Sequence, residues 1–527
     1  MSDVSGAELL AIGDRIVAMA KTGEQVEVVV GRSSSTEVRV YEGDIEQLAS
    51  ATSAGIGVRV ISDHRQGFAY AGSLDEDVLA ETLAEARDNA TFATPDEWLG
   101  LAEPDGVAIP DLDLYREALL KAPTDAKIDL AMELERALRA EDPRISGVES
   151  ADYADGVSEG AVVSTTGIRA YGSETSCYVA ASCVAQDGDD TQTGFGFSVG
   201  RSPEDLDVAV AAADASRRAT RLLGATQPQS GRVTVVLDPY VTAQLLGIIG
   251  STLSGEAVLK GRSLFADRLG EEVAASCLTL VDDATNPLAY SSSETDGEGL
   301  ASRRNVLIDG GRLHQFVHNA YTARRAGTTS TANAVRGFSS TPSVGCRALS
   351  LVPGTELQPA LLSQVGEGVL ISSVSGLHSG VNPVSGDFST GAEGLRISGG
   401  ELGEPLREFT IASSLQRMLA EKDHALECLN QLMDALRVDP PGVDTALLTE
   451  VRRAFAHVAL WVRGHVLCAR ACIYSRLAGS ASGLSAAQRS QLATHMRTLR
   501  AIRARHPLCR AFDRGDGTDH GDPCRAR

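Results

Sequence analysis

The sequence predicts an α+β protein with a mixed α/β N-terminal domain, a β-rich C-terminal domain and a helical C-terminal tail. Helical and strand-like patterns alternate in the first half, short strands and Gly-rich turns fill the second, and long amphipathic stretches replace both near the end. At 527 residues the chain is too long for one ordinary core, so several domains are expected. Its content of 43% hydrophobic and 22% charged residues is that of a folded soluble protein.

The N-terminal domain is expected over residues 1–225 and opens with apolar residues at helical spacing in Ala7–Ala20. Alternating apolar and polar residues then predict an antiparallel sheet with one solvated face, interrupted by helices. Ser202 followed by Pro203 predicts the start of a last helix that runs to Leu223. The other expected elements are strands Val26–Val30, Glu37–Tyr41, Gly57–Ile61 and Gly67–Ala71, helices Asp75–Asn89 and Asp113–Ala140, and strands Gly160–Val163, Gly167–Tyr171 and Thr175–Ala185.

The β-rich domain is expected over residues 231–414, after a Gly- and Pro-containing linker. The run Val306–Leu313, with Gly310 and Gly311 at its centre, predicts a β-hairpin. Short apolar runs separated by Gly-rich turns continue to the end of this domain. The second half of the protein is therefore expected to consist mainly of strands.

Beyond Ser414 the pattern changes to long amphipathic stretches. They predict a helical bundle of unknown role over residues 419–510 and a disordered end over residues 511–527. Residues 415–527 hold 17 Lys and Arg against 11 Asp and Glu, whereas the whole chain carries a net charge of −22. The tail is thus a different kind of sequence from the part before it.

The negative net charge argues against nonspecific nucleic-acid binding, which needs a basic surface, and against docking on anionic lipid. The N-terminus shows no secretory signal pattern, and no apolar run approaches the ~20 residues needed to span a bilayer. The nine cysteines are scattered and odd in number, which is typical of reduced thiols. A cytoplasmic protein without nucleic-acid or membrane partners is expected.

One loop, Gly376–Ala392, is crowded with Gly, Ser, Asn and Pro and leads into the strand-like run Gly394–Ile397. Such a loop costs conformational entropy and buries little apolar surface, so a role in a site or an interface is more natural than one in packing. His378, Asn382 and Asp387 are its candidates for contacting a peptide or a partner.

This loop resembles a segment of the TldD/PmbA family of peptidase-related proteins. The resemblance continues through Asp238-Pro239, Ser254–Ser263 and Ala412–Ser414, and it spans roughly residues 5–418. Several separate motifs fall in the order in which the family has them. The resemblance implies the same two-domain α+β layout.

The catalytic branch of that family has a zinc site with His-Glu-x-x-x-His on a helix and a Cys near the C-terminal loop. Two His about one turn apart can share a metal ion, while the Glu activates water. The matching stretch here, Val241–Thr252, contains no His, Cys, Asp or Glu. Ser251 stands at the position of the lost second His, and Ala392 lies near that of the Cys. The resemblance thus implies the PmbA (TldE) branch, with no catalytic residue and no cofactor in this chain.

The resemblance implies a non-catalytic subunit that forms a heterodimer or larger complex with a zinc-bearing TldD-type homologue and acts on small or unfolded peptides. Two alternatives remain open: a metallopeptidase or hydrolase active on its own, and a regulatory scaffold that uses the Arg-rich tail. The family's closing strands are not recognisable after Ile411–Ser413. Either a helical domain has replaced them or the gene has shifted frame near codon 419.

Two further groups of residues could carry chemistry. Asp282-Asp283 and the pair Asp296 and Glu298 could act as acid and base, but solvated turn residues are the simpler interpretation. His314 and His318 follow the hairpin turn and are expected on a strand, which would hold them about 13 Å apart, too far to share a metal ion.

Overall fold

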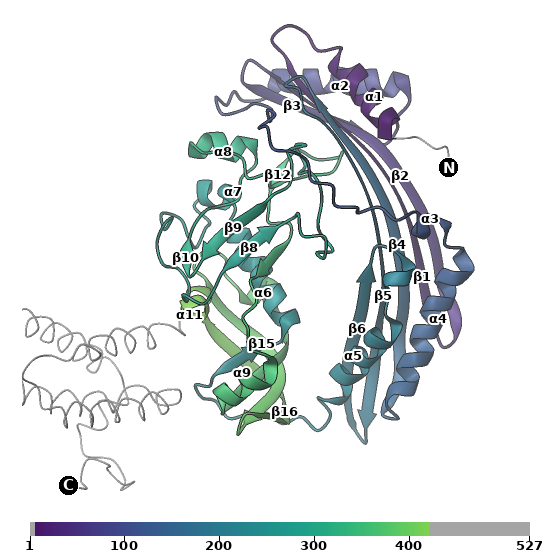
Figure 1. Cartoon of the computed structure of the whole chain (residues 1–527), viewed down its shortest axis with the longest axis vertical. Coiled ribbons are helices and arrows are strands. Elements are labelled where there is room, and N and C mark those ends of the chain that lie inside the picture. Colours follow the sequence, from purple (N-terminus) through teal and green to yellow (C-terminus); the bar gives the residue numbers. More distant parts are fainter. Residues whose placement is uncertain (1–5, 421–527) are drawn as a thin grey trace, which may run out of the picture. The chain divides into compact units, whose positions relative to one another are not determined.

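The computed structural model describes residues 6–420, and its fold is mixed α+β, as the sequence predicts (Figure 1). The expectations for the helical bundle, for the disordered end and for a frame shift concern residues after 420, which lie outside the described part. Two regions are distinguished below: an N-terminal region, residues 6–224, and a C-terminal region, residues 231–420. The boundaries of the expected domains stay predictions.

The N-terminal region is built on one long antiparallel sheet with the strand order β3-β2-β1-β4-β5-β6. Figure 1 shows it as a curved layer. The turn between β1 and β2 places Glu42 and Gly43 at φ values of 52° and 79°, as tight two-residue hairpins require. The strands are β1 Gln25–Tyr41, β2 Asp44–Ser62, β3 Arg65–Ala71, β4 Ile145–Ser164, β5 Arg169–Asp187 and β6 Asp190–Gly200.

Strand β1 is longer than the sequence predicts. The runs Val26–Val30 and Glu37–Tyr41, expected as separate strands, belong to one strand of 17 residues. The polar residues between them stay in the sheet because β1 is paired on both sides: Ser34 lies opposite Thr52 of β2 and Val157 of β4. Backbone pairing does not depend on side-chain polarity, so it continues through the break in the apolar pattern.

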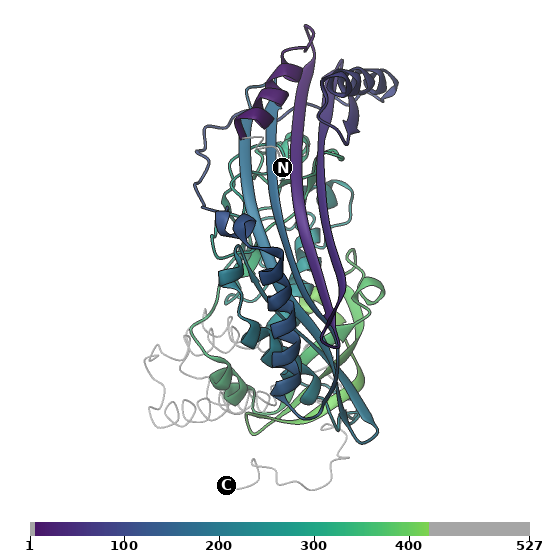
Figure 2. The ribbon, with the colours of Figure 1, turned by 90° about the vertical axis from the view of Figure 1, so that its right-hand side faces the viewer.

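Helices cover one face of the large sheet, and Figure 2 looks onto this helical layer. Apolar residues of the helices and of alternate strand positions form two cores beneath it, one around Leu9 and Val28 and one around Leu134 and Val179. The helices are α1 Gly6–Val17, α2 Glu76–Phe92, α3 Glu117–Lys121, α4 Thr124–Glu141 and α5 Val208–Thr220.

The stretch Asp113–Ala140, expected as one helix, is divided into α3 and α4. Pro123 lies between them, and proline disfavours the helical conformation in the residue before it. Ala122 is accordingly extended, with ψ of 120°. A single proline therefore explains the difference.

The helix expected from Ser202 also begins later. Ser202 and Asp205 close a capping box around the short 3-10 turn Pro203–Asp205. A second cap follows, because the side chain of Asp207 accepts a hydrogen bond from the backbone N–H of Val210 at the start of α5. Ser202 is therefore a cap, as its sequence context predicts, but it caps the 3-10 turn and not helix α5.

The C-terminal region contains two four-stranded sheets and one pair of short strands, with the orders β16-β15-β14-β7, β10-β9-β8-β13 and β11-β12. The strands are β7 Val235–Leu237, β8 Leu280–Asp283, β9 Arg304–Asp309, β10 Arg312–Leu313, β11 Ala334–Val335, β12 Ser343–Val344, β13 Leu349–Leu351, β14 Gly368–Ser375, β15 Asp387–Ser398 and β16 Glu401–Ser414. The expected hairpin Val306–Leu313 is confirmed as β9 and β10.

The helices of the C-terminal region surround its core, in which α6 is central: Val241, Leu245 and Ile249 are all buried. No helix within residues 6–420 has both the length and the apolar character needed to cross a membrane. The helices are α6 Pro239–Thr252, α7 Gly255–Leu259, α8 Ala320–Ala326, α9 Gln358–Val365, α10 Leu377–Gly380 and α11 Leu415–Ala420.

The second face of the large sheet packs on the C-terminal region, and Phe338 of that region lies against three glycines of the sheet. Gly31, Gly55 and Gly57, on the neighbouring strands β1 and β2, lie under this residue. A Cβ atom at Gly57 would come within 2.0 Å of the carbonyl oxygen of Phe338. The glycines therefore allow backbone and ring to approach the sheet more closely than any other residue would.

Candidate functional site: a charged pocket between the two regions

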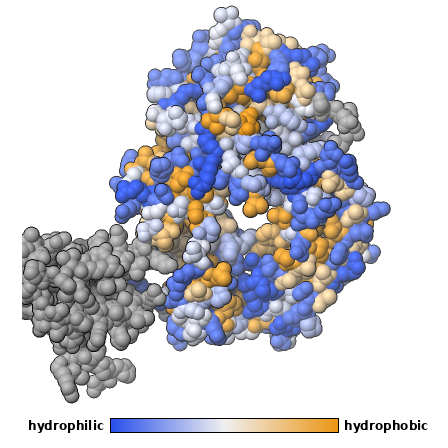
Figure 3. All heavy atoms as spheres, viewed as in Figure 1, coloured by the Kyte–Doolittle hydropathy of each residue, from blue (hydrophilic) through white to orange (hydrophobic). Residues whose placement is uncertain are grey.

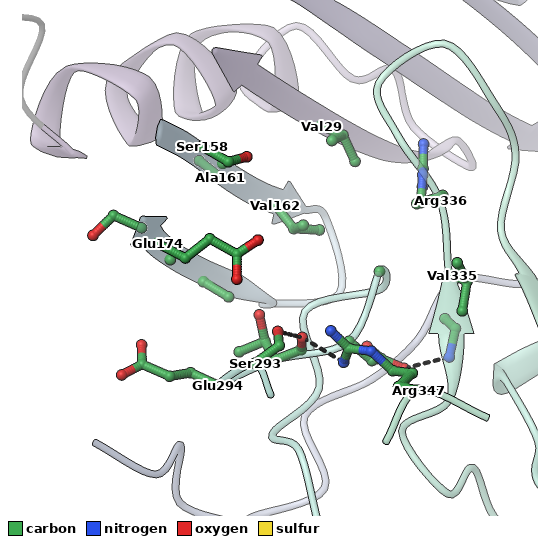
Figure 4. Close-up of a pocket in the computed structure, with 18 of the residues that line it drawn as sticks. Val29, Ser158, Ala161, Val162, Glu174, Ser293, Glu294, Val335, Arg336 and Arg347 are labelled. Atoms are coloured by element: carbon green, nitrogen blue, oxygen red, sulfur yellow. Dashed lines mark hydrogen bonds between the residues drawn. The ribbon is translucent and has the colours of Figure 1, made fainter. Parts of the chain in front are cut away.

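A pocket with a volume of about 270 Å³ lies where the C-terminal region meets the large sheet (Figure 4). Strands β1, β4 and β5 supply one side, and the segments 293–297, 334–336 and Arg347 supply the other. The lining residues are Val29, Leu114, Ser158, Gly160, Ala161, Val162, Ala170, Gly172, Ser173, Glu174, Ser293, Glu294, Thr295, Asp296, Gly297, Ala334, Val335, Arg336 and Arg347.

Four buried charges adjoin this pocket and join the two regions. Glu27 and Arg59 are cross-strand neighbours on β1 and β2, and the guanidinium of Arg59 donates two hydrogen bonds to Glu27, at 3.0 and 2.9 Å. Arg59 Nη2 also donates to Glu298 Oε1 at 3.2 Å. Arg336 Nη1 forms an ion pair with Glu27. The exposed fractions of these four side chains are between 0% and 4%, so the cluster is dry and electrically balanced.

Burial alone would raise the pKa of Glu27, but Arg59 and Arg336 outweigh it and hold the pKa below its usual range. Burial lowers the pKa of Arg336. Its Nε and Nη2 atoms have no hydrogen-bond partner within residues 6–420 although both are buried. Unsatisfied buried donors cost free energy, so Arg336 retains unused capacity to bind an acceptor.

Asp296 and Asp282 contradict the interpretation of the acidic pairs as solvated turn residues: their residues are only 3% and 1% exposed, and Glu298 is 1% exposed. Asp296 accepts hydrogen bonds from the backbone N–H groups of Glu298, Leu300 and Ala334, at 2.9, 3.0 and 3.0 Å. These carboxylates organise loops that become buried because the C-terminal region folds onto the sheet.

Burial, together with the nearby charge of Glu298, raises the pKa of Asp296 to about 7, although its three backbone donors act in the opposite direction. A carboxyl group that titrates near neutrality can give up or take a proton under ordinary conditions. Asp282 has a structural role, because it accepts hydrogen bonds from the backbone N–H groups of Arg347 and Ala348, at 2.8 and 2.7 Å. It thereby fixes the segment that carries Arg347.

Glu174 and Arg347 point into the pocket from opposite sides (Figure 4). Arg347 Nη1 donates to the carbonyl oxygen of Thr295 at 2.8 Å and lies 3.4 Å from Ser302 Oγ. Burial raises the pKa of Glu174 and lowers that of Arg347. The pocket thus presents a carboxyl group and a guanidinium cation on facing walls, and it can bind a ligand with complementary charges.

The loop residues expected to contact a partner, His378, Asn382 and Asp387, are exposed and do not line this pocket. Asn382 Oδ1 accepts hydrogen bonds from the backbone N–H groups of Val384 and Ser385, at 2.9 and 3.2 Å. Asp387 accepts one from the Ser385 hydroxyl at 2.8 Å. Two of the three side chains therefore shape the loop, and only His378, on the short helix α10, is left as a pure surface group. Their contact with a partner stays a prediction.

Helix α6 is where a family zinc site would lie, and its residues do not fit a metal ion. The Ser251 hydroxyl, at the position of the lost ligand, donates to the carbonyl oxygen of Ile248 at 2.7 Å. A sulfur beside the helix, Cys346 Sγ, lies 3.7 Å from the carbonyl oxygen of Gly250. Within residues 6–420 no group of three or more His, Cys, Asp or Glu could hold a metal ion. A helix without His, Cys, Asp or Glu offers no donor set for zinc.

The two histidines after the hairpin are not on a strand, contrary to the expectation. Between Leu313 and α8 only Val317 forms a β-bridge, because the chain turns there into the helix capped by Asn319. His318 is buried, with Nδ1 3.2 Å from Thr322 Oγ1, whereas His314 is exposed. Neither residue lines the pocket.

Sequence reasoning missed Glu27, Arg59, Glu174, Arg336 and Arg347. A signal existed for the first two, because each is a single charge between valines in a strand-like run. Such a charge on the inner face of a sheet needs a partner. No local pattern marks the other three, which meet only through the packing of the two regions.

Models of three successive domains of one family match the chain: "PmbA/TldA metallopeptidase domain 1" over residues 26–90, the central domain over 117–223 and the C-terminal domain over 230–433. Metalloprotease PmbA of Escherichia coli O157:H7 is 26% identical over 420 residues, which cover 77% of this chain and 88% of that protein. A metalloprotease of Methanocaldococcus jannaschii is 26% identical over 420 residues, covering 78% and 91%.

The fold is also similar to a solved structure. TldE from Thermococcus kodakarensis superimposes with a TM-score of 0.71 at 24% identity, and the match covers 79% of this chain and 93% of that protein. At that identity the likeness concerns the fold alone. It agrees with the α+β arrangement described above.

Proposed function

Since this chain belongs to the PmbA/TldD metallopeptidase family, we propose that it is the non-catalytic subunit of a peptidase complex. Its partner would be a TldD-type homologue that carries the zinc, and the complex would cleave small or unfolded peptides in the cytoplasm. The observation that supports this most directly is helix α6, whose only polar group at the family's metal position is the hydroxyl of Ser251.

A subunit of this kind needs surfaces for its partner and for an extended peptide. Strand β6 is an edge of the large sheet, and Phe197 and Val199 on it are 46% and 43% exposed. On the face of the described part that is seen in Figure 1, hydrophobic residues are intermixed with hydrophilic ones (Figure 3). An edge strand with exposed apolar side chains can accept another strand by backbone hydrogen bonding, which supports the proposed role.

The proposal is tested by metal analysis and by reconstitution. The purified chain should contain no stoichiometric zinc and cleave no unfolded peptide, because it lacks a donor set for the ion. Activity should appear when a homologue with an intact His-Glu-x-x-x-His motif is added. A tightly bound zinc ion whose removal by a chelator abolishes peptidase activity of the chain alone would establish the first alternative, an enzyme in its own right.

The same assay tests the loop. His378→Ala removes a surface side chain without touching the hydrogen bonds that shape the loop, whereas Asn382→Ala removes two of them. If the loop contacts the partner or the peptide, His378→Ala should lower assembly or turnover while the thermal stability stays unchanged. If only Asn382→Ala has an effect, and stability falls with it, the loop has a structural role alone.

A further inference from the structure

We propose that the pocket binds a small zwitterion, a free α-amino acid or a dipeptide, with Arg347 holding the carboxylate and Glu174 the ammonium group. The inference goes beyond the proposed function and does not depend on it, because it concerns binding by this chain alone. It follows from the placement of three charged side chains and from the size of the cavity.

The pocket has two electrically different walls. Arg336 and Arg347 belong to the C-terminal region, and Figure 4 shows them on one side, with Glu174 on strand β5 on the other. Two further acidic residues line the pocket: Asp296 accepts three backbone hydrogen bonds, and Glu294 accepts one from the backbone N–H of Leu112 at 3.1 Å. One wall therefore attracts an anion and the opposite wall a cation.

The charged side chains on the two walls have hydrogen-bonding groups that no residue of the described part occupies. Among the described residues no ion pair or hydrogen bond involves the carboxylate of Glu174, and Arg347 uses only Nη1. Arg336 has two donors without a partner, and its side chain is 1% exposed. A charge held in a cavity is costly unless an opposite charge pairs with it. A ligand with both charges would satisfy both walls at once.

The size of the pocket sets the size of the ligand. Its volume of about 270 Å³ lies just below the ~300 Å³ at which pockets for drug-sized molecules begin. An amino acid or a dipeptide fits such a space. Val29 and Val162 also line the pocket and offer an apolar surface to a small side chain.

Isothermal titration calorimetry on the full chain tests the proposal with four ligands: L-alanine, Ala-Ala, N-acetyl-Ala-Ala and Ala-Ala-amide. We expect at least one of the first two to bind, and the better of them identifies the length of the ligand. If the dipeptide is the ligand, each capped peptide should bind at least tenfold more weakly than Ala-Ala. If alanine is the ligand, N-acetylalanine and alaninamide are used instead, and each should bind at least tenfold more weakly than alanine. No binding of alanine or Ala-Ala at millimolar concentration, or equal binding of capped and free ligands, would overturn the proposal.

Variants assign the two walls. Glu174→Gln should abolish the preference for a free ammonium group, and Arg347→Gln the preference for a free carboxylate, whereas Arg347→Lys should retain part of it. Glu272→Gln and Arg312→Gln, which change a surface pair with a separation of 3.7 Å, serve as matched controls and should bind like the unmodified chain. A general loss of structure would weaken all ligands equally and leave no selective change. In that event the capped ligands on the unmodified chain still decide the question.

Discussion

Asp296 shows at the scale of one residue how burial changes the chemistry of an ordinary side chain. Its three backbone hydrogen bonds would suit a carboxylate, yet burial and the charge of Glu298 raise its pKa to about 7 from the usual 3.8 of an aspartate. The folded protein therefore binds a proton at pH 5 to 6 that the unfolded chain has released. By linkage, this proton stabilises the fold at low pH, and the stabilisation is lost as the pH rises through 7.

We expect the contribution of Asp296 to the free energy of unfolding to fall between about pH 4 and about pH 7, so the variant Asp296→Asn should lose less stability over this range. A pKa difference of about three units corresponds to roughly 4 kcal/mol, which is an upper limit for the change. Urea denaturation at several pH values measures it, with Asp309→Asn, an exposed aspartate, as the control. Identical pH slopes for Asp296→Asn and the unmodified chain would show that Asp296 is ionised throughout.

The sequence could not give this behaviour. Asp296, Gly297 and Glu298 read as a turn, and a turn they are, since Asp296 accepts hydrogen bonds from the next residues along the chain. The local pattern could not predict that this turn is buried, because the residues that cover it, Ala334 and Arg336, come some forty residues later in the sequence. Turn chemistry is local, whereas exposure depends on tertiary packing.

At the scale of elements, sheet pairing decided what local patterns could not. The sequence predicted the type of the N-terminal elements well, since the apolar alternation of residues 57–61 and 67–71 does correspond to β2 and β3. It failed where a neighbour imposes structure, as in the polar middle of β1. It also failed where one proline, Pro123, ends a helix in an otherwise continuous helical pattern. The stretch Val241–Thr252, matched to a helix of the family, does lie within helix α6.

The contact between β2 and Phe338 offers a test at this scale. Gly57→Ala would place a methyl carbon 2.0 Å from the carbonyl oxygen of Phe338, so the C-terminal segment must move away from the sheet. We expect the free energy of unfolding to fall by about 1–3 kcal/mol, the usual cost of overpacking a buried site. Chemical denaturation measures this loss.

Gly147→Ala is the matched control, because Gly147 also lies in a strand of the large sheet, β4, but a Cβ atom there meets nothing within 4 Å. It should change stability little. If both variants were equally stable, the segment around Phe338 would be free to shift, and the close approach would not help to hold the two regions together.

At the scale of the described part as a whole, the buried cluster of Glu27, Arg59, Glu298 and Arg336 is shared between the two regions. Each region supplies one Glu and one Arg: Glu27 and Arg59 pair within the sheet, whereas Glu298 and Arg336 find their ion-pair partners on the sheet of the other region. Removing one partner of such a cluster leaves a buried charge unpaired and typically costs about 3–5 kcal/mol. The two regions should accordingly depend on each other for stability.

Arg59→Met tests this dependence. We expect it to lower the free energy of unfolding by about 3–5 kcal/mol and to weaken hydrogen-exchange protection in α6 as well as in β1, although Arg59 lies in the N-terminal region. Lys121→Met, which breaks an exposed pair with Glu117, should change little. Protection lost in β1 alone would mean that the C-terminal region is stable without the sheet.

The order of strands in the large sheet also constrains how the chain reaches its native state. Strand β1 pairs with β2, the next strand, but its other neighbour is β4, so Glu27 must find Ser164 across more than a hundred residues. During synthesis the hairpins of β1, β2 and β3 can form early. One edge of β1 stays unpaired until β4 has been synthesised. Such distant pairings are slow, and an open strand edge invites association with other chains in the meantime. The most vulnerable period in the life of this protein is therefore expected to be the interval between the emergence of β1 and that of β4.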